Sequence, residues 1–218
     1  CTNLANITIS DDARLEEVGE YAFRGCENLE QMTFPASLKV IDNAFYMCGI
    51  VHVDLSKTHL EDLNLEFYQC KALQAVILPS TGTLKTITSL GTAATSLVIP
   101  QGVERIESMT CDYMKSITLP SSLTYFGSST LGNGAKVICE ATTPPAGLGL
   151  TCGMRSGKSY RDIYIYIPAG TASAYSNYKY IPERSHSEYY YFSPLIEMMD
   201  TDVPVNVVSD ENGITVLG

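Results

Sequence analysis

Apolar residues recur along the chain with a period of 20 to 25 residues. One element of the repeat has the form Leu-x-x-Ile-x-Ile, and its third apolar position falls at residues 9, 34, 55, 78, 99, 119 and 139. The last two apolar residues of each copy are two positions apart, as they are on the buried side of a strand. Proline or serine follows the first six copies, and proline suits a turn because it cannot donate to a β-ladder. The pattern predicts seven short strands.

A second apolar element lies about half a period after the first. Its copies are Leu15-x-x-Val18, Leu38-x-x-Ile41, Leu60-x-x-Leu63, Leu84-x-x-Ile87, Val103-x-x-Ile106 and Leu123-x-x-Phe126. Three copies continue into Phe-x-x-Cys, which ends at Cys26, Cys48 and Cys70, and later copies are shorter. Two apolar stripes per period are typical of a solenoid, because one coil cannot bury its apolar side alone whereas stacked coils share a core. Neighbouring strands are expected to pair as a parallel sheet with a spacing of about 4.8 Å.

The combined pattern resembles the BspA-like leucine-rich repeats, also called the Treponema pallidum type. The resemblance covers residues 1–139 and is most specific at Ala22-Phe23-x-x-Cys26 and Ala44-Phe45-x-x-Cys48. It implies a repeat solenoid, mainly β, built as a right-handed leucine-rich-repeat coil with a parallel sheet and a β-rich C-terminal cap. It also implies an extracellular or outer-surface bacterial protein. Such proteins are typical of Bacteroides-like and other host-associated bacteria, and some are adhesins for host matrix proteins.

Three regions are expected along the chain. Residues 1–139 form the array of about six to seven coils, residues 140–203 form a C-terminal cap, and residues 204–218 form a hairpin-like tail that could begin a further module. Gly, Pro, Thr and Ser are frequent over 140–159, which indicates a loop. A strand is expected over 163–167 and a short helix over 171–178 with Thr171 as its N-cap. Asn212-Gly213 favours the turn of a hairpin in the tail.

The composition of the chain limits the kinds of partner that it can bind. The chain has 218 residues and a formal net charge of -10, and an acidic chain without a Lys/Arg cluster repels phosphate backbones, so nucleic acid is excluded as a partner. No run of about 18 apolar residues occurs, so no membrane span is expected within this chain. No signal peptide is visible. Cys1 falls in the middle of a repeat, so we expect the sequence to begin inside a longer array.

Seven cysteines are present, and the repeat cysteines are expected to be buried thiols rather than metal ligands. They are more than 20 residues apart, whereas zinc sites need two close pairs of ligands. Cys139 and Cys152 flank the loop after the repeats and are the candidate pair for a disulfide in an oxidising compartment, with free thiols as the alternative. The segment 153–159 resembles a phosphate-binding loop, but a strand-like run rather than a helix follows it, so no cofactor is expected.

Few residues suggest catalysis. His52 and Asp54 alternate on one predicted strand and could begin a catalytic or metal site, but their spacing brings no third group beside them, and a solvated polar pair is the simpler interpretation. Acidic pairs such as Glu16-Glu17 lie in turns, and acids that are neighbours in sequence do not become the facing carboxylates of a glycosidase. We therefore predict that the chain is not an enzyme.

The predicted strands turn alternate residues outward, and this outward face is the candidate ligand-binding surface. Its proposed contact residues are Gln31, Thr33, His52, Asp54, Ile77, Val98, Ser116 and Thr118. Adjacent exposed Ile77 and Val98 among polar residues would suit the centre of a protein interface, although β-branched residues also simply fit strands. The leading hypothesis is a binding or adhesion module for a protein or glycan ligand, such as a host matrix component. The alternatives are a structural spacer that displays another domain and a hydrolase acting on host glycans.

Overall fold

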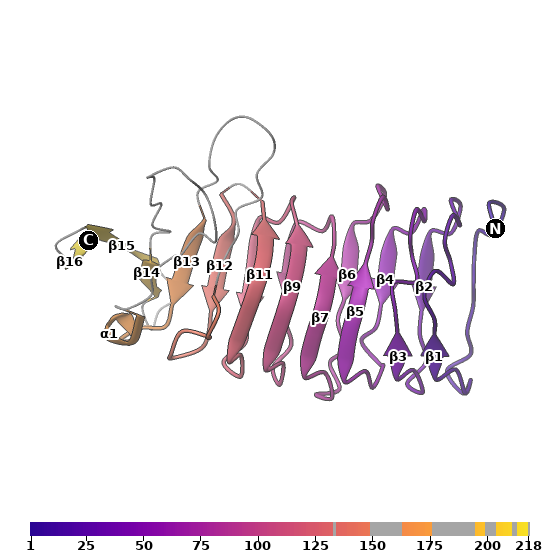
Figure 1. Cartoon of the computed structure of the whole chain (residues 1–218), viewed down its shortest axis with the longest axis horizontal. Coiled ribbons are helices and arrows are strands. Elements are labelled where there is room, and N and C mark those ends of the chain that lie inside the picture. The colour runs from indigo at the N-terminus through magenta and orange to yellow at the C-terminus, as the bar shows by residue number, and fades with distance from the viewer. Residues whose placement is uncertain (133, 149–162, 176–194, 199–203, 211–212, 218) are drawn as a thin grey trace.

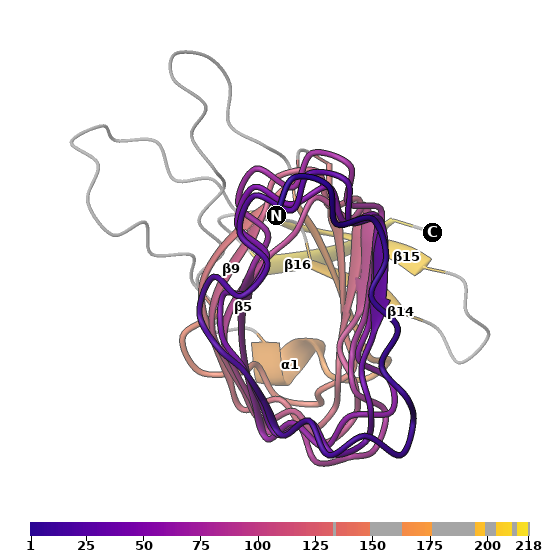
Figure 2. The same cartoon turned by 90° about the vertical axis from the view of Figure 1, so that its right-hand side faces the viewer.

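The chain winds as a solenoid with strands along two opposite sides (Figures 1 and 2). The computed structural model describes residues 1–132, 134–148, 163–175, 195–198, 204–210 and 213–217. In a view along the axis the coils superpose, and the single described helix, α1 (Ala172–Tyr175), lies at the C-terminal end (Figure 2). The mainly parallel strands and the near absence of helix confirm the predicted fold class.

The first apolar element of the repeat forms the strands of one side, which we call the front face. These strands are β2 (Gln31–Thr33), β4 (His52–Asp54), β6 (Ala75–Ile77), β8 (Ser96–Val98), β10 (Ser116–Leu119) and β12 (Lys136–Cys139). Each lies inside a segment that the sequence predicts as a strand. The first predicted copy, residues 4–9, forms only one bridge, from Asn6 to Gln31.

The second apolar element forms the strands of the opposite side, the back face. They are β1 (Glu17–Val18), β3 (Val40–Ile41), β5 (Asp62–Glu66), β7 (Thr86–Gly91), β9 (Arg105–Cys111) and β11 (Tyr125–Leu131). The sequence predicts this stripe of buried residues without assigning strands to it. The strands lengthen toward the C-terminus, as the shorter coils there lose the Phe-x-x-Cys loop.

The front face departs from the expected continuous ladder at one place. Strands β2, β4 and β6 form one sheet and β8, β10 and β12 belong to another, so β6 and β8 are not hydrogen-bonded neighbours. The break coincides with a change in coil length: six positions separate Phe67 from Leu73, and only two separate Thr92 from Ala94. Coils of unequal length cannot keep both ladders in register. The back ladder continues through this point with a register shift at Leu63/Asn64, and the front ladder breaks.

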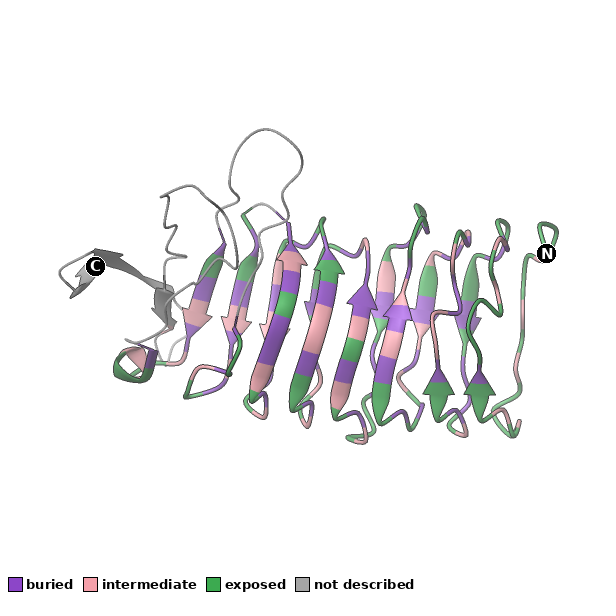
Figure 3. Cartoon of the chain, in the orientation of Figure 1, coloured by how far each residue is buried: buried purple, intermediate pink, exposed green. Residues whose placement is uncertain are grey.

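Alternate residues of the strands fill the interior between the two faces (Figure 3). Leu29, Leu38, Phe45 and Ile50, for example, are fully buried. The rings of the Phe-x-x-Cys loops stack along the axis. Phe45 lies 5.3 Å from Phe23 and 5.6 Å from Phe67, measured between ring centroids. The repeat therefore supplies the stacked core that one coil alone could not form.

The front sheet continues past the last repeat. Strand β13 (Tyr164–Ile167) pairs in parallel with β12, and β14 (Leu195–Met198) pairs in parallel with β13. Strand β15 (Pro204–Asp210) is antiparallel to β14 and to β16 (Gly213–Leu217), which confirms the predicted strand near residue 165 and the strands of the predicted hairpin. The division of the chain into an array, a cap and a tail stays a prediction.

The helix α1 begins directly after Thr171, as predicted. The hydroxyl of Thr171 donates to the carbonyl oxygen of Pro168 at 2.7 Å. The end of the predicted helix at 176–178 and Asn212 of the predicted turn lie outside the described residues, as does the segment 153–159.

Candidate binding face

The eight predicted contact residues all lie on the front face, and none of them is buried. In the first sheet Gln31 is in register with His52, and Thr33 with Asp54 and then Ile77. In the second sheet Ser96 is in register with Ser116, and Val98 with Thr118. The side chains therefore form two rows that run along the solenoid. Asp54, Ser116 and Thr118 are half-buried, and the others are exposed.

Ile77 and Val98 are the apolar members of this set. The side chains are 50% and 68% exposed, and they hold equivalent positions on either side of the break between β6 and β8. The polar members, including His52 and Asp54, lie mainly toward the N-terminus. The break leaves facing strand edges that make no hydrogen bonds to one another.

No third catalytic or metal-ligating group lies in register with His52. The register neighbours of His52 are Gln31 and Ala75, neither of which is a nucleophile or a metal ligand. One carboxylate oxygen of Asp54 accepts a hydrogen bond of 2.8 Å from the backbone N–H of Ser56. Within the described ranges, no group of three His, Cys, Asp or Glu residues is placed to hold a metal ion.

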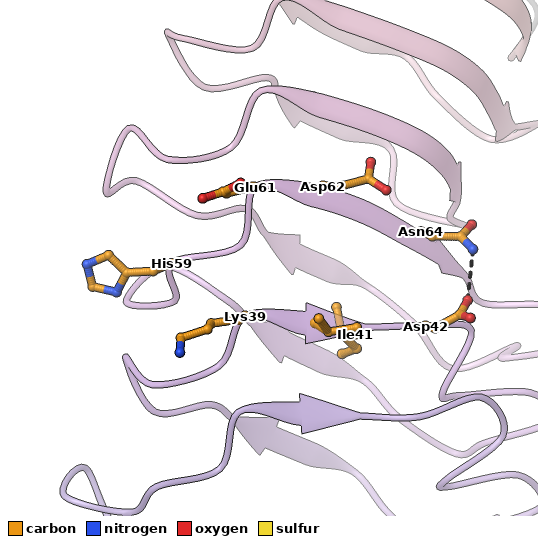
Figure 4. A pocket seen from close by; sticks show the side chains of 8 residues that line it. Lys39, Ile41, Asp42, His59, Glu61, Asp62 and Asn64 are labelled. Atoms are coloured by element: carbon orange, nitrogen blue, oxygen red, sulfur yellow. Dashed lines mark hydrogen bonds between the residues drawn. The ribbon is translucent and has the colours of Figure 1, made fainter.

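A shallow cleft of about 530 Å³ lies on the back face between β3 and β5 (Figure 4). Its lining residues are Lys39, Val40, Ile41, Asp42, His59, Glu61, Asp62 and Asn64. The acidic groups are largely occupied: the Asn64 amide donates to Asp42 at 2.8 Å, and the Thr88 hydroxyl donates to Asp62 at 2.9 Å. At the other end of the cleft, a ring nitrogen of His59 lies 2.9 Å from the carbonyl oxygen of Ala36. These hydrogen bonds link neighbouring coils across the cleft.

The repeat cysteines are buried thiols, as predicted, and Cys26, Cys48, Cys70 and Cys111 are at most 3% exposed. The thiol of Cys70 donates to the carbonyl oxygen of Phe45 on the preceding coil at 2.6 Å. Burial raises the pKa of Cys70 from 9.0 to about 11 and that of Cys111 to about 12. These thiols are therefore protonated at neutral pH, which makes them poor nucleophiles and poor metal ligands.

Cys139 is also buried, at the end of the repeat array. Its sulfur lies 3.2 Å from the hydroxyl oxygen of Tyr175, and that hydroxyl donates to the carbonyl oxygen of Ala141 at 2.8 Å. Burial raises the pKa of the Cys139 thiol. Cys152, the proposed disulfide partner, lies outside the described residues, so the pairing stays a prediction. The structure shows a partner of Cys139 that the sequence did not suggest, which is Tyr175. Through this contact Tyr175 connects α1 to the last coil of the array.

An exposed row of aromatic and arginine side chains is the feature that the sequence analysis missed. It lies on the connections that lead from back strands to front strands, residues 19–30, 42–51 and 67–74, which we call the ridge. Arg24, Tyr46 and Tyr68 follow the core phenylalanines at equivalent positions of three successive coils. The Arg24 guanidinium carbon lies 5.1 Å from the centroid of the Tyr46 ring, and that ring stacks on Tyr68 at 5.1 Å. The sequence does contain a signal for this row, because the residue directly after Phe in each Phe-x-x-Cys copy is Arg24, Tyr46 or Tyr68.

These features define the class of protein as a leucine-rich-repeat solenoid. The chain belongs to the family described as the BspA type leucine rich repeat region, whose pattern matches residues 1–108 and 90–144 in six copies. Repeats of this family are typically non-catalytic, and leucine-rich repeats generally serve as protein-interaction modules. In the described parts of the chain, no helix has the length and apolar character needed to cross a membrane.

A solved structure with some similarity is described as the crystal structure of the pneumococcal vaccine antigen PcpA. The two chains are 15% identical, with a TM-score of 0.37. The match covers 75% of this chain and 57% of the PcpA chain, so the present sequence spans little more than half the length of that structure. No curated protein matches the sequence.

Proposed function

We propose that the chain is a non-catalytic binding module, displayed outside a bacterial cell, whose front face engages a protein ligand such as a host matrix component. The observation that carries this proposal is the exposure of Ile77 and Val98 at the break in the front sheet. Membership of the BspA type repeat family supports the assignment as an interaction module.

The size and rigidity of the face support the same proposal. At about 4.8 Å per strand, the six strands from β2 to β12 make a face about 25 Å long, so several coils can contribute to one contact. The ladders hold the outward rows in place, so a ligand does not have to order them on binding. The register neighbours of this apolar pair are Asp54 beside Ile77 and Thr118 beside Val98, so polar residues border it as they do at the rim of an interface.

A hydrolase finds less support. Its catalytic carboxylates would have to be free and facing, but Asp42, Asp62 and Asp54 accept hydrogen bonds within the scaffold. A glycan on the front face is the alternative ligand, and a spacer is the alternative role.

Replacing Ile77 and Val98 with aspartate should weaken binding to the cognate protein by at least about tenfold, because two carboxylates would be desolvated in the contact. The measurement is surface plasmon resonance against purified fibronectin, laminin and type I collagen. Val40→Asp is the matched control, since Val40 is 47% exposed on back strand β3 and its replacement should leave binding unchanged.

Two outcomes would contradict this proposal. If the unaltered chain bound none of the three matrix proteins, the assignment to host matrix would be wrong. If it bound one of them and the Ile77→Asp/Val98→Asp variant bound equally well, Ile77 and Val98 would not be part of the binding site, and the ligand would bind elsewhere on the solenoid.

A further inference from the structure

The ridge carries a ladder of stacked side chains that ends abruptly at Tyr68. Tyr21 meets Tyr46 edge-on at 5.9 Å, and Arg24 lies over both rings, at 5.6 Å from the first and 5.1 Å from the second. Tyr46 and Tyr68 stack nearly parallel, with 19° between their planes. Among the described residues, Tyr46 makes the one ring contact of Tyr68, and Tyr68 keeps 55% of its area exposed.

The next coil contributes no ring to this ladder. Glu66 is in register with Gly91, so Phe67 corresponds to Thr92, and Tyr68 corresponds to Ala93. The connection is also four residues shorter than on the preceding coil. Six positions lead from Phe67 to Leu73, the first apolar residue of the next front segment, whereas only two lead from Thr92 to the equivalent Ala94. The ridge therefore steps down beside Tyr68. One face of the ring is stacked on Tyr46, and the next coil carries the small residues Thr92, Ala93 and Ala94 at the equivalent positions.

The backbone at the ridge is held in a conformation that side chains normally avoid. Met47 and Gln69, which directly follow Tyr46 and Tyr68, have φ angles of 54° and 58°. The equivalent residue of the first coil is Gly25, with a φ of 68°. Glycine adopts this region without cost, whereas other residues do so at a cost that concentrates at functional sites. The side chains of Met47 and Gln69 are both exposed, so they lie beside Tyr46 and Tyr68 on the surface of the ridge.

We propose that the free face of Tyr68 is a binding site for a pyranose ring of a β-linked, gluco-configured oligosaccharide. Such a ring has all its hydroxyls equatorial and presents a flat C–H face, which packs against the electron-rich face of an aromatic ring. The stacked rings of the ladder are 5.1 Å apart, so a sugar ring fits the position that another ring would take on the next coil. Exposed Gln69 and Lys71 flank Tyr68 and can bond the equatorial hydroxyls.

The shape of the site favours a sugar over a protein. The exposed surface at the end of the ridge consists of the Tyr68 ring and a few neighbouring residues. A stable protein partner needs a contact area of about 800 Å² on each side. The site is also separate from Ile77 and Val98 of the front face. The inference therefore does not rest on the proposed function, and either can fail without the other.

The test is a calorimetric titration of the full chain with cellotetraose. Tyr68→Ala and Tyr68→Leu are expected to weaken cellotetraose binding at least about tenfold, and Tyr68→Phe to change it less than about twofold. Tyr164→Ala, which removes a tyrosine that is 37% exposed on β13, is the matched control and should bind as the unaltered chain does.

The same titration also separates this site from the front face. The Ile77→Asp/Val98→Asp variant should bind cellotetraose as well as the unaltered chain does, even if it has lost its protein ligand. The inference is overturned if the unaltered chain does not bind cellotetraose, or if Tyr68→Ala binds it equally well. Loss of binding in Tyr68→Phe would also overturn it, because the hydroxyl rather than the ring face would then be the contact.

Discussion

Replacing Phe45 with alanine is expected to lower the free energy of unfolding by about 3–5 kcal/mol. Phe45 is fully buried and stacks between Phe23 and Phe67, with Phe34 edge-on at 6.3 Å. Its removal would leave a cavity in the middle of the stack. The coils on either side are fixed by hydrogen bonds to their neighbours, such as that from Phe23 N to Ala44 O at 2.9 Å, so the cavity cannot readily collapse. The measurement is urea unfolding followed by circular dichroism.

The matched control for this prediction is Phe23→Ala. Phe23 belongs to the same ladder but is only half-buried, and it stacks on one neighbour instead of two. Its replacement should cost clearly less than that of Phe45. Equal losses for the two variants, or a loss below about 1 kcal/mol for Phe45→Ala, would show that the phenylalanine stack does not hold the coils together.

The second large effect is expected for Gly49→Ala, which should lower the free energy of unfolding by about 1–3 kcal/mol or more. A Cβ at this position would lie 1.9 Å from the carbonyl oxygen and 2.7 Å from the carbonyl carbon of Glu27. Both are backbone atoms, and the Gly49 N–H donates to the Cys26 carbonyl oxygen at 3.1 Å, so relief of the clash requires one coil to move from the next. Thermal unfolding with the same optical signal measures the loss.

Gly19→Ala serves as the control, because no atom lies within 4 Å of the Cβ that it would add. This variant should be as stable as the unaltered chain or slightly more stable, since alanine restricts the unfolded chain. If Gly49→Ala were equally harmless, the close approach of neighbouring coils at Glu27 would not exist in solution.

The sequence predicts the repeat well because each coil has to bury the same positions. The repeat pattern requires Leu29, Met32 and Phe34 to point into the core, and all three are buried. The alternation then places Gln31 and Thr33 outward with no further information. Ile77 and Val98 are exposed for the same reason.

Features that depend on differences between coils could not be predicted in this way. The break between β6 and β8 arises where a connection loses four residues, and a repeat pattern describes what coils share rather than how unequal coils fit together. The stack of Arg24, Tyr46 and Tyr68 uses three different residues whose common position becomes visible only when the coils are superposed. The contact of Tyr175 with Cys139 joins residues 36 positions apart in the sequence, and no repeat pattern relates them.

Hydrogen exchange of the chain with and without its bound matrix protein tests the central claim most directly. The account predicts that the ligand slows exchange in the front strands β6 and β8, residues 75–77 and 96–98, and leaves the back strands β7 and β9 unchanged. Slower exchange confined to the back face, with residues 75–77 and 96–98 unaffected, would contradict the account and place the binding site on the opposite side of the solenoid.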